Sequence, residues 1–504
     1  MAARGEVLRL TDFSGGLNLD DPEYLIDLNA SPELQNIDLL SKGFKKRFGD
    51  VVFNSTAMDS GAAVTGLGYV KFTSGTEFLN AVAGTKFFKS ASLSGTMTDA
   101  SGAVTITTGQ DKIWVPVLYN DLQIWFGGNP NAPFKFNGVG NAAALGGTPP
   151  SAVTGFVSNN RTFGIQTAAN PSRIFWSVLA NPEDWTGTGS GNADVAMNDG
   201  DKLRVGIPLS ADRAILFKDT STHLMILTKA PFPIYQLQKG IGVAGSYAAV
   251  NVRGMIYFIS PSKRMYATSD GVNFIDFPTN INSLWDTVNS SRIEYIQGIY
   301  VPSLEQIHWY VSTGTSTTNN VCLVWDLQRK CWLYHPTGFA VNVPALVQNR
   351  RLFGGHYNGK IYEKEKDGTY SDASVTSGII DARWRTPFNG YNLMSGTIHP
   401  LWVDFAVSSS PGSTMSTCYG FDFNANQTCE TFALQITAAQ WDVAMWDVDL
   451  WAGSGTVIQR MLVSGRGNVF SVKFSNAVSG QGFVFQGATV QVRTDRARKL
   501  QEVS

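Results

Sequence analysis

The sequence predicts an all-β protein, and three observations carry that prediction. From about Gly66 onward, short runs alternate apolar and polar residues, and almost no helical periodicity interrupts them. The runs are separated by turns such as "FNGVG", "YNGKIY" and "KDGTY", whose Asn-Gly and Asp-Gly pairs suit the positive φ angles of type I′ hairpins. Groups of these hairpins recur at roughly 40 residues, the length of one four-stranded propeller blade.

The first element is an extended N-terminal arm, predicted over residues 1–60. This stretch is polar and loop-like and has no obvious core of its own. One short helix is expected in "SPELQNIDLL", where Ser31 could cap a helix that begins at Pro32.

The second element is a β-propeller of about seven blades, predicted over residues 61–376. In its clearest unit, Ile307, Trp309 and Val311 alternate onto one face of a strand. Radial repetition buries both faces of each sheet, which fits a chain with only 16% charged residues. The predicted units begin near the following residues: Gly66, Val104, Val153, Lys202, Gly245, Ile296 and Pro344.

The third element is a β-sandwich-like domain, predicted over residues 377–504. Its strands are longer, as in "NVFSVKF" with Phe470, Val472 and Phe474 on one face, and the 40-residue period is lost. Helices are expected to be minor throughout, with a second short one in "NINSLWDTV".

Composition excludes several classes of protein. With 39 basic and 40 acidic residues, the chain lacks the positive field that tight DNA binding requires. It has no apolar run near the roughly 18 residues of a membrane span and no secretory signal, so synthesis in the cytoplasm is expected. The four cysteines match neither zinc spacing nor a dense disulfide framework, and they are predicted to be free, packed thiols: Cys322, Cys331, Cys418 and Cys429.

Signals for catalysis are weak. "GIGVAG", from Gly240 to Gly245, matches a dinucleotide fingerprint, but a strand-like segment follows where a helix is required, so it is interpreted as a turn. The five histidines form no close metal-binding pair, and no GxSxG or P-loop motif occurs. We therefore expect no enzyme, no cofactor and no metal site.

Two groups of side chains are candidates for contact with other molecules. Basic clusters supply four candidates for proximity to DNA, although a solvated surface or a protein partner is the more ordinary interpretation: Lys45, Lys46, Arg496 and Arg498. "WDVAMWDVDLW" supplies large rings that could anchor loops in a sandwich core or contact another subunit: Trp441, Trp446 and Trp451.

The order of motifs along the chain carries a resemblance. The arm has Gly-Gly-Leu-Asn at residues 15–18, Leu-x-Asn-x-Asp at 34–38, and Gly43 followed by Arg-x-Gly at 47–49. Then come "GIGVAGSYAAVNVRGMIYFIS", "IYVPSLEQIHWYV", "VCLVWDLQRKCWLYH", "ARWRTPFN" and the Trp-Asp-rich segment. Together they resemble the tail nozzle, or hub, proteins of short-tailed bacteriophages, including the tail tubular protein B and packaged-DNA-stabilisation types.

The resemblance implies a structural virion protein. Such proteins form rings, commonly hexamers, below the portal and adaptor, where they retain the packaged genome and conduct it during ejection. It implies transient contact with double-stranded DNA, with tail fibres or tailspikes as further candidate partners, and a place in the virion tail after synthesis in the host cytoplasm. Five residues of the arm are then predicted to dock on neighbouring proteins: Leu17, Asn18, Leu34, Asn36 and Arg47.

The docking interpretation has a consequence for truncation. If the arm orders only against its neighbours, removal of residues 1–50 should leave the propeller folded and block tail assembly.

Two other functions stay open. A propeller glycosidase or sialidase would need paired carboxylates, or a tyrosine with an acid, that converge in a pocket. A receptor-binding tail adhesin would more typically show a fibrous repeat or a trimeric stalk. The sequence has no positive signal for either function.

Overall fold

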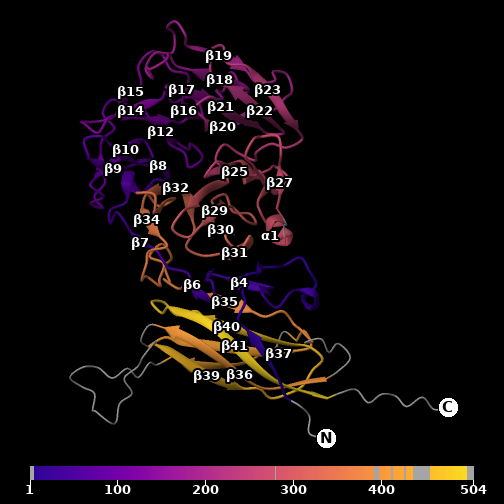
Figure 1. Ribbon diagram of the computed structural model, residues 1–504. Coiled ribbons are helices and arrows are strands. Elements are labelled where there is room, and N and C mark those ends of the chain that lie inside the picture. The colour runs from indigo at the N-terminus through magenta and orange to yellow at the C-terminus, as the bar shows by residue number, and fades with distance from the viewer. Residues whose placement is uncertain are drawn as a thin grey trace, which may run out of the picture.

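The computed structural model describes residues 5–277, 280–390, 397–409, 412–424, 427–434 and 455–495. It confirms the all-β prediction, because the described part contains seven four-stranded antiparallel sheets and two larger ones. Figure 1 shows the seven sheets arranged as a propeller at the top and the two larger sheets below, with the N-terminal segment between them.

The propeller sheets follow one another along the chain, and six are each continuous in sequence. The first three are β8 (Val64–Lys71), β9 (Glu77–Ala83), β10 (Lys86–Ala91) and β11 (Thr98–Asp99); β12 (Val115–Tyr119), β13 (Leu122–Phe126), β14 (Phe134–Phe136) and β15 (Ala143–Ala144); and β16 (Thr154–Ser158), β17 (Arg161–Ile165), β18 (Arg173–Trp176) and β19 (Gly191–Asp194).

The next three continue around the ring. They are β20 (Leu203–Ser210), β21 (Arg213–Lys218), β22 (Ser221–Ile226) and β23 (Ile234–Lys239); β24 (Ala249–Val252), β25 (Met255–Ile259), β26 (Met265–Thr268) and β27 (Ile275–Asp276); and β28 (Gln297–Val301), β29 (Gln306–Val311), β30 (Val321–Asp326) and β31 (Cys331–His335).

The seventh sheet closes the ring with strands from both ends of the propeller. Its order is β32 (Val341–Val347), β33 (Arg351–His356), β34 (Ile361–Lys364) and β7 (Val51–Val52). Val51 pairs with Glu363 and Val52 with Tyr362. Because β32 also contacts β8, the first and last sheets meet, and an early segment of the chain supplies the final strand.

The lower unit is a sandwich of two sheets. One has the order β39 (Thr456–Leu462), β36 (Thr397–Ser409), β41 (Phe483–Asp495), β6 (Phe44–Lys46) and β5 (Ile37–Leu39), with β1 (Gly5–Leu10) also on β41. The other has the order β38 (Thr428–Ala433), β37 (Thr414–Phe421), β40 (Phe470–Asn476), β35 (Ala382–Arg385) and β4 (Glu33–Gln35).

Aromatic rings fill the space between the two sandwich sheets. The Phe485 ring lies with its centroid 4.7 Å from that of Phe44 and 4.4 Å from that of Phe474. On β41, Phe483, Phe485, Val490 and Val492 are buried on the inner side of the strand. Since Phe44 comes from the arm, the sandwich core includes the N-terminal segment.

Short elements complete the chain. The strands β2 (Gly16–Leu17) and β3 (Ala30–Ser31) pair in parallel. The helices are η1 (Glu23–Leu25), η2 (Met58–Gly61), η3 (Ser290–Tyr295) and the α-helix α1 (Asn282–Asp286). Nowhere in the described part is a helix long and apolar enough to cross a membrane.

The helix predicted in "SPELQNIDLL" is wrong, whereas the one in "NINSLWDTV" is confirmed as α1. The first segment forms β3, β4 and β5 instead. Ser31 donates a hydrogen bond to the Arg385 carbonyl rather than capping a helix, and Leu34 pairs with Trp384 across the sheet. Pairing with a distant strand therefore overrides the local helix signal.

The cysteine prediction is half wrong. Cys322 and Cys331 are free and buried, as predicted. Cys418 and Cys429 form a disulfide, because they are directly opposed in the β37–β38 hairpin with 4.0 Å between their Cα atoms. Sequence spacing did not reveal the hairpin register that brings them together.

Candidate functional site

The five predicted docking residues lie in the segment between the propeller and the sandwich (Figure 1). All five side chains are buried within the chain itself: Leu17, Asn18, Leu34, Asn36 and Arg47. They contact other parts of the same chain, so the segment is built into both units. We call the region formed by residues 30–50, 334–339 and 372–381 the junction.

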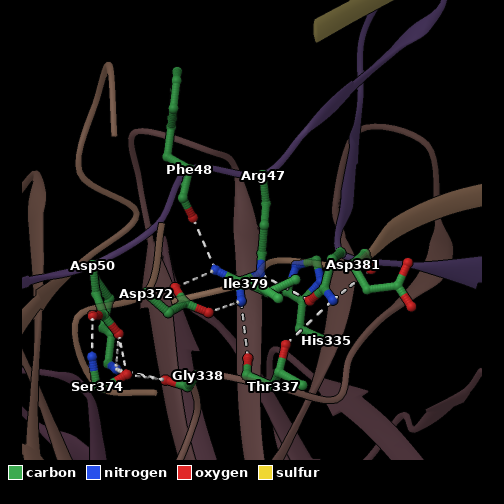
Figure 2. Close-up of polar contacts among 12 residues, drawn as sticks. Arg47, Phe48, Asp50, His335, Thr337, Gly338, Asp372, Ser374, Ile379 and Asp381 are labelled. Atoms are coloured by element: carbon green, nitrogen blue, oxygen red, sulfur yellow. Dashed lines mark hydrogen bonds and ion pairs between the residues drawn. The ribbon is translucent and has the colours of Figure 1, made fainter. Parts of the chain in front are cut away.

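Arg47 lies at the centre of the junction (Figure 2). Its Nη1 and Nη2 atoms donate to the Asp372 carboxylate over 3.0 and 2.5 Å. Nη2 also donates to the Thr337 carbonyl, and Nη1 to the Phe48 carbonyl, each over 2.9 Å. Its Nε donates to Oδ1 of Asn36, so every nitrogen of the guanidinium has a partner inside the protein.

Asn36 connects the propeller to the linker that precedes β35. Its backbone has a φ of 51°, a left-handed conformation that asparagine tolerates better than most residues. In this conformation its N–H donates to the Tyr334 carbonyl on β31, and its side-chain amide donates to the Asp381 carbonyl. Asn36 thus ties β31 of the sixth sheet to the start of the sandwich.

A second buried ion pair lies beside the first. The Lys364 ammonium is 2.6 Å from Oδ2 of Asp50, and both side chains are at most 2% exposed. Lys364 also donates to the Gly338 carbonyl, and Oδ1 of Asp50 accepts from the Ser374 N–H (Figure 2). Two ion pairs therefore hold the end of β34 and the linker that follows it against residues 47–50.

Two glycines of the arm, Gly43 and Gly49, lie too close to the backbone of other segments to carry a side chain. A Cβ atom on Gly43 would lie 1.9 Å from the Phe485 carbonyl oxygen, and the φ of Gly43 is +83°. A Cβ on Gly49 would lie 2.0 Å from the Ser371 carbonyl oxygen. Any other residue would push the arm away from β41 or from the linker.

Two carboxyl groups are buried at the edge of the junction. Burial raises the pKa of Glu365 well above its usual range, and the nearby charge of Asp38 adds to this rise. Neither carboxylate oxygen of Glu365 has a hydrogen-bond partner among the described residues. Burial also raises the pKa of Asp38, which lies 3.8 Å from the Lys45 ammonium and beside Gln306.

A cavity of about 750 Å³ opens at this edge, between the sixth and seventh sheets and the arm. Its lining is strongly charged and includes Lys45, Arg350, Arg351, Glu363, Glu365 and Lys366. Arg351 is already paired with Glu363 over 2.7 Å, and Lys366 with Glu363 over 3.3 Å. Much of the charge is therefore engaged within the chain.

The two histidines of the sixth sheet lie behind this cluster. Burial lowers the pKa of His308 to about 3 and that of His335 well below its usual range. Both rings are therefore neutral at physiological pH, and the His335 ring stacks on Phe339 with centroids 5.5 Å apart. Among the described residues, no group of three or more His, Cys, Asp or Glu could hold a metal ion.

The structure places the other predicted site residues as follows. Lys45 is half-buried at the cavity. Lys46 is buried, its ammonium donates to Oδ1 of Asn476 and to the Val478 carbonyl, and burial lowers its pKa to about 8. It thus offers no exposed surface to DNA. The remaining candidates lie outside the described residues: Trp441, Trp446, Trp451, Arg496 and Arg498.

Sequence reasoning missed the partners of the arm. Asp50, Lys364 and Asp372 were not selected, although the alternating charges of "EKEKDGTYSD", residues 363–372, lie at the end of the last predicted blade. A dense charge run at the end of a domain usually indicates a solvated turn. Only the fold shows that Glu363, Lys364 and Asp372 of this run are buried.

A second pocket, of about 260 Å³, lies at the propeller axis. Its lining is mostly apolar and contains no carboxylate group. Every propeller sheet contributes at least one residue from its first strand: Leu67, Val115, Thr154, Val205, Ala249, Gln297 and Val343.

Comparisons with known proteins concern the fold alone. No protein-family model and no curated protein matches the chain. Similar solved structures include YCF48 bound to D1 peptide (8% identity, TM-score 0.41, 66% of this chain and 98% of that one) and BamB from Moraxella catarrhalis (11%, 0.38, 72% and 99%). The WD40 β-propeller domain of Doa1 is also similar (9%, 0.40, 63% and 96%).

Proposed function

We propose that the chain is a structural subunit of a short phage tail. In this proposal it forms a nozzle or hub ring, commonly a hexamer, below the portal and adaptor, where the ring retains the packaged genome and conducts it during ejection. The protein acts in the virion tail, after synthesis in the host cytoplasm, and is not an enzyme.

One observation carries the proposal. The arm motifs on which the family resemblance rests are the residues that build the junction, including Asn36, Gly43, Arg47 and Gly49. Buried ion pairs contribute little net stability compared with apolar packing, but they demand one geometry. A junction of this kind suits a subunit whose two units must keep a fixed orientation under the load of a pressurised genome.

The axial pocket favours this function over a glycosidase. A glycosidase of the kind considered above would need paired carboxylates, or a tyrosine with an acid, in a pocket, and the lining of the pocket at the axis includes Tyr247 but no acid. With a volume of about 260 Å³ it is also far too small for duplex DNA, whose major groove alone is about 12 Å wide. The DNA conduit of the proposed ring therefore lies between copies of the chain.

The proposal is tested on virus particles. Antibodies against the chain, visualised with gold in the electron microscope, should label the tail of the phage that encodes it. Particles produced with the reading frame interrupted should fail to retain their genome, which becomes sensitive to added nuclease. Normal infectious particles from the interrupted frame would contradict the proposed function.

A second measurement addresses the ring. The native mass of the purified chain, with negative-stain images of the same fraction, should reveal assemblies of about six copies around an axial hole, a number that rests on the resemblance. Cleavage of a fluorogenic glycoside, or binding to host cells by the chain alone, would instead favour the two alternative functions.

A further inference from the structure

The arm presents a rigid, exposed tip that the junction does not use. Residues 19–27, "LDDPEYLID", leave the side chains of Leu19, Tyr24 and Leu25 exposed by 37%, 46% and 60%. The same nine residues carry no basic side chain and four acidic ones: Asp20, Asp21, Glu23 and Asp27. We call residues 19–27 the knuckle.

Hydrogen bonds hold the knuckle in one conformation. Oδ1 of Asn18 accepts from the N–H groups of Asp20 and Asp21, each over 3.3 Å, and its side-chain amide donates to Asp21. Arg385, itself buried, donates two hydrogen bonds to the Glu23 carboxylate over 2.9 and 2.8 Å.

The far side of the knuckle is fixed to the propeller. The Asp20 carboxylate accepts from the N–H groups of Asn282 and Ser283 at the start of α1, over 2.8 and 3.2 Å. A surface already ordered in this way loses little conformational entropy when it binds. The knuckle therefore has the properties of a preformed docking element, and three large apolar side chains at its surface require an explanation.

A second exposed surface has the complementary character. The sandwich sheet formed by β39, β36, β41 and β1 turns Phe405 and Val403 inward, so the alternating residues lie on its outer face. There Val7, Ile458 and Leu462 are exposed by 56%, 73% and 72%. We call this surface the outer sheet face.

Basic side chains accompany the apolar ones. Leu462 and Trp402 are directly opposed across the strands, and Gln491 and Val7 continue the same row. The Arg460 guanidinium lies 4.8 Å from the Trp402 ring and is paired with Asp404. Arg9 and Arg493 are exposed on the same face, so its described side chains include three arginines and one acid.

We propose that the knuckle of one copy of this chain docks on the outer sheet face of a second copy. Exposed apolar side chains on both surfaces would be buried, and the acidic knuckle would approach a face that carries three arginines. Trp402 and Arg460 are of the two residue types most often found as binding anchors. This inference rests on the proposed function, in which copies of the chain form a ring.

The contact is tested by site-specific photo-cross-linking. Tyr24 is replaced by benzoylphenylalanine in unlabelled protein, which is mixed with ¹⁵N-labelled wild type and irradiated. Mass spectrometry should identify peptides that join position 24 of an unlabelled chain to β36, β39 or β41 of a labelled one. Intermolecular products that map to other surfaces, or no intermolecular product, would overturn the proposal.

Paired variants separate the two surfaces. Leu25→Asp and Ile458→Asp each place a charge in the proposed contact and should weaken self-association, measured by analytical ultracentrifugation, by about tenfold or more. Val139→Asp is the matched control, because Val139 is 76% exposed on the propeller, and it should leave self-association unchanged.

The outcomes also separate this contact from the proposed function. Rings that persist in Leu25→Asp and Ile458→Asp would overturn the contact and leave the tail function standing. The tail function is judged independently, by antibody labelling of particles and by genome retention.

Discussion

Arg47 and Asp372, the ion pair at the centre of the junction, are unusual because they are almost completely buried. The side chains of Arg47 and Asp372 are 2% and 1% exposed, respectively, and the Arg47 guanidinium is saturated with partners. Removing one member of such a pair leaves the other charge buried without compensation, which costs more than the pair itself contributes.

Arg47→Ala should therefore destabilise the protein strongly. We expect a loss of about 3–5 kcal/mol in the free energy of unfolding, measured by denaturant titration. The control is Arg460→Ala, since Arg460 is 56% exposed and its ion pair with Asp404 should contribute about 1 kcal/mol or less. Equal losses in the two variants would contradict the importance of burial.

Glu365→Gln should stabilise the protein at neutral and alkaline pH. Burial, with the charges of Asp38 and Asp372, raises the pKa of Glu365 and outweighs the lowering by Arg47 and Lys45. A carboxyl group with a raised folded-state pKa contributes stability below its unfolded pKa and loses it as pH rises through the folded-state pKa. The glutamine side chain of the variant is neutral at every pH, so it avoids a buried negative charge.

The measurement is the melting temperature of both proteins between pH 5 and pH 9, a range of about four units around neutrality. The melting temperature of Glu365→Gln should exceed that of the wild type by an amount that grows as pH rises. Glu363→Gln is the opposite case: burial alone would raise the pKa of Glu363, but hydrogen bonds and charges from Arg351, with Lys366, lower it. Glu363→Gln should be less stable than wild type at neutral pH. A higher melting temperature of this variant at that pH would contradict the lowered pKa of Glu363.

At the scale of elements, the arm contributes strands to three sheets of the propeller and sandwich, and its β2 and β3 form a further small sheet. It supplies β7 to the propeller and β4, β5 and β6 to the sandwich, and Phe44 packs in the sandwich core. The structure thus changes the expectation that the propeller stays folded without residues 1–50. Deletion of residues 1–50 would also remove the ion pair between Asp50 and Lys364.

Deletion of residues 1–53 should open the propeller ring. Without β7, the edge of β34 loses its partner and becomes available for aggregation. We expect lower solubility and faster cleavage of the seventh sheet in limited proteolysis. Deletion of residues 1–10, which removes only β1, is the control and should leave proteolysis of the propeller unchanged. Equal cleavage of the seventh sheet in the two deletion variants would contradict the closure of the propeller ring by β7.

The disulfide acts on one hairpin of the sandwich. Cys418 and Cys429 close a short loop between β37 and β38. The Cys418→Ser, Cys429→Ser double variant should lose about 2–3 kcal/mol of stability, an effect that chain-entropy arguments assign to loops of this size. Unfolding curves of the wild type with and without reductant should differ by the same amount, and the double variant should show no such difference.

Much of the propeller could be predicted because each of its first six sheets is built from neighbouring hairpins, and hairpin signals are local. The strands β2 to β7 of the arm could not, since they are two or three residues long and Val51 pairs with Glu363 more than 300 positions away. Sequence indicated that Asn36 and Arg47 make specific contacts. It did not indicate that the partners, Asp372 and Asp381, belong to the same chain.

At the scale of the whole molecule, charge is nearly balanced. The chain has 39 basic and 40 acidic residues, and the buried Arg47 and Lys364 are each paired with an aspartate of the same chain. A conduit with this balance would not grip its cargo, because each phosphate contact adds binding that opposes sliding.

Duplex DNA should therefore bind the purified chain weakly. We expect a Kd above about 10 μM at roughly 150 mM salt, at the weak end of non-specific binding. Fluorescence anisotropy with a labelled duplex of about 30 base pairs measures it, with a salt titration as the control for electrostatic binding. A Kd below about 1 μM at that salt would contradict a passive conduit.

The position of the arm also sets an order of events during synthesis. Residues 5–46 leave the ribosome before the rest of the described chain, yet β6 finds β41 only when Val484 and Phe485 emerge about 440 residues later. At about 5–20 residues per second, this delay is about 20–90 s. Throughout that time Phe13 and Phe44 lack Phe485, whose ring contacts both of theirs, so this early part of the chain is among the last to be protected and needs a chaperone.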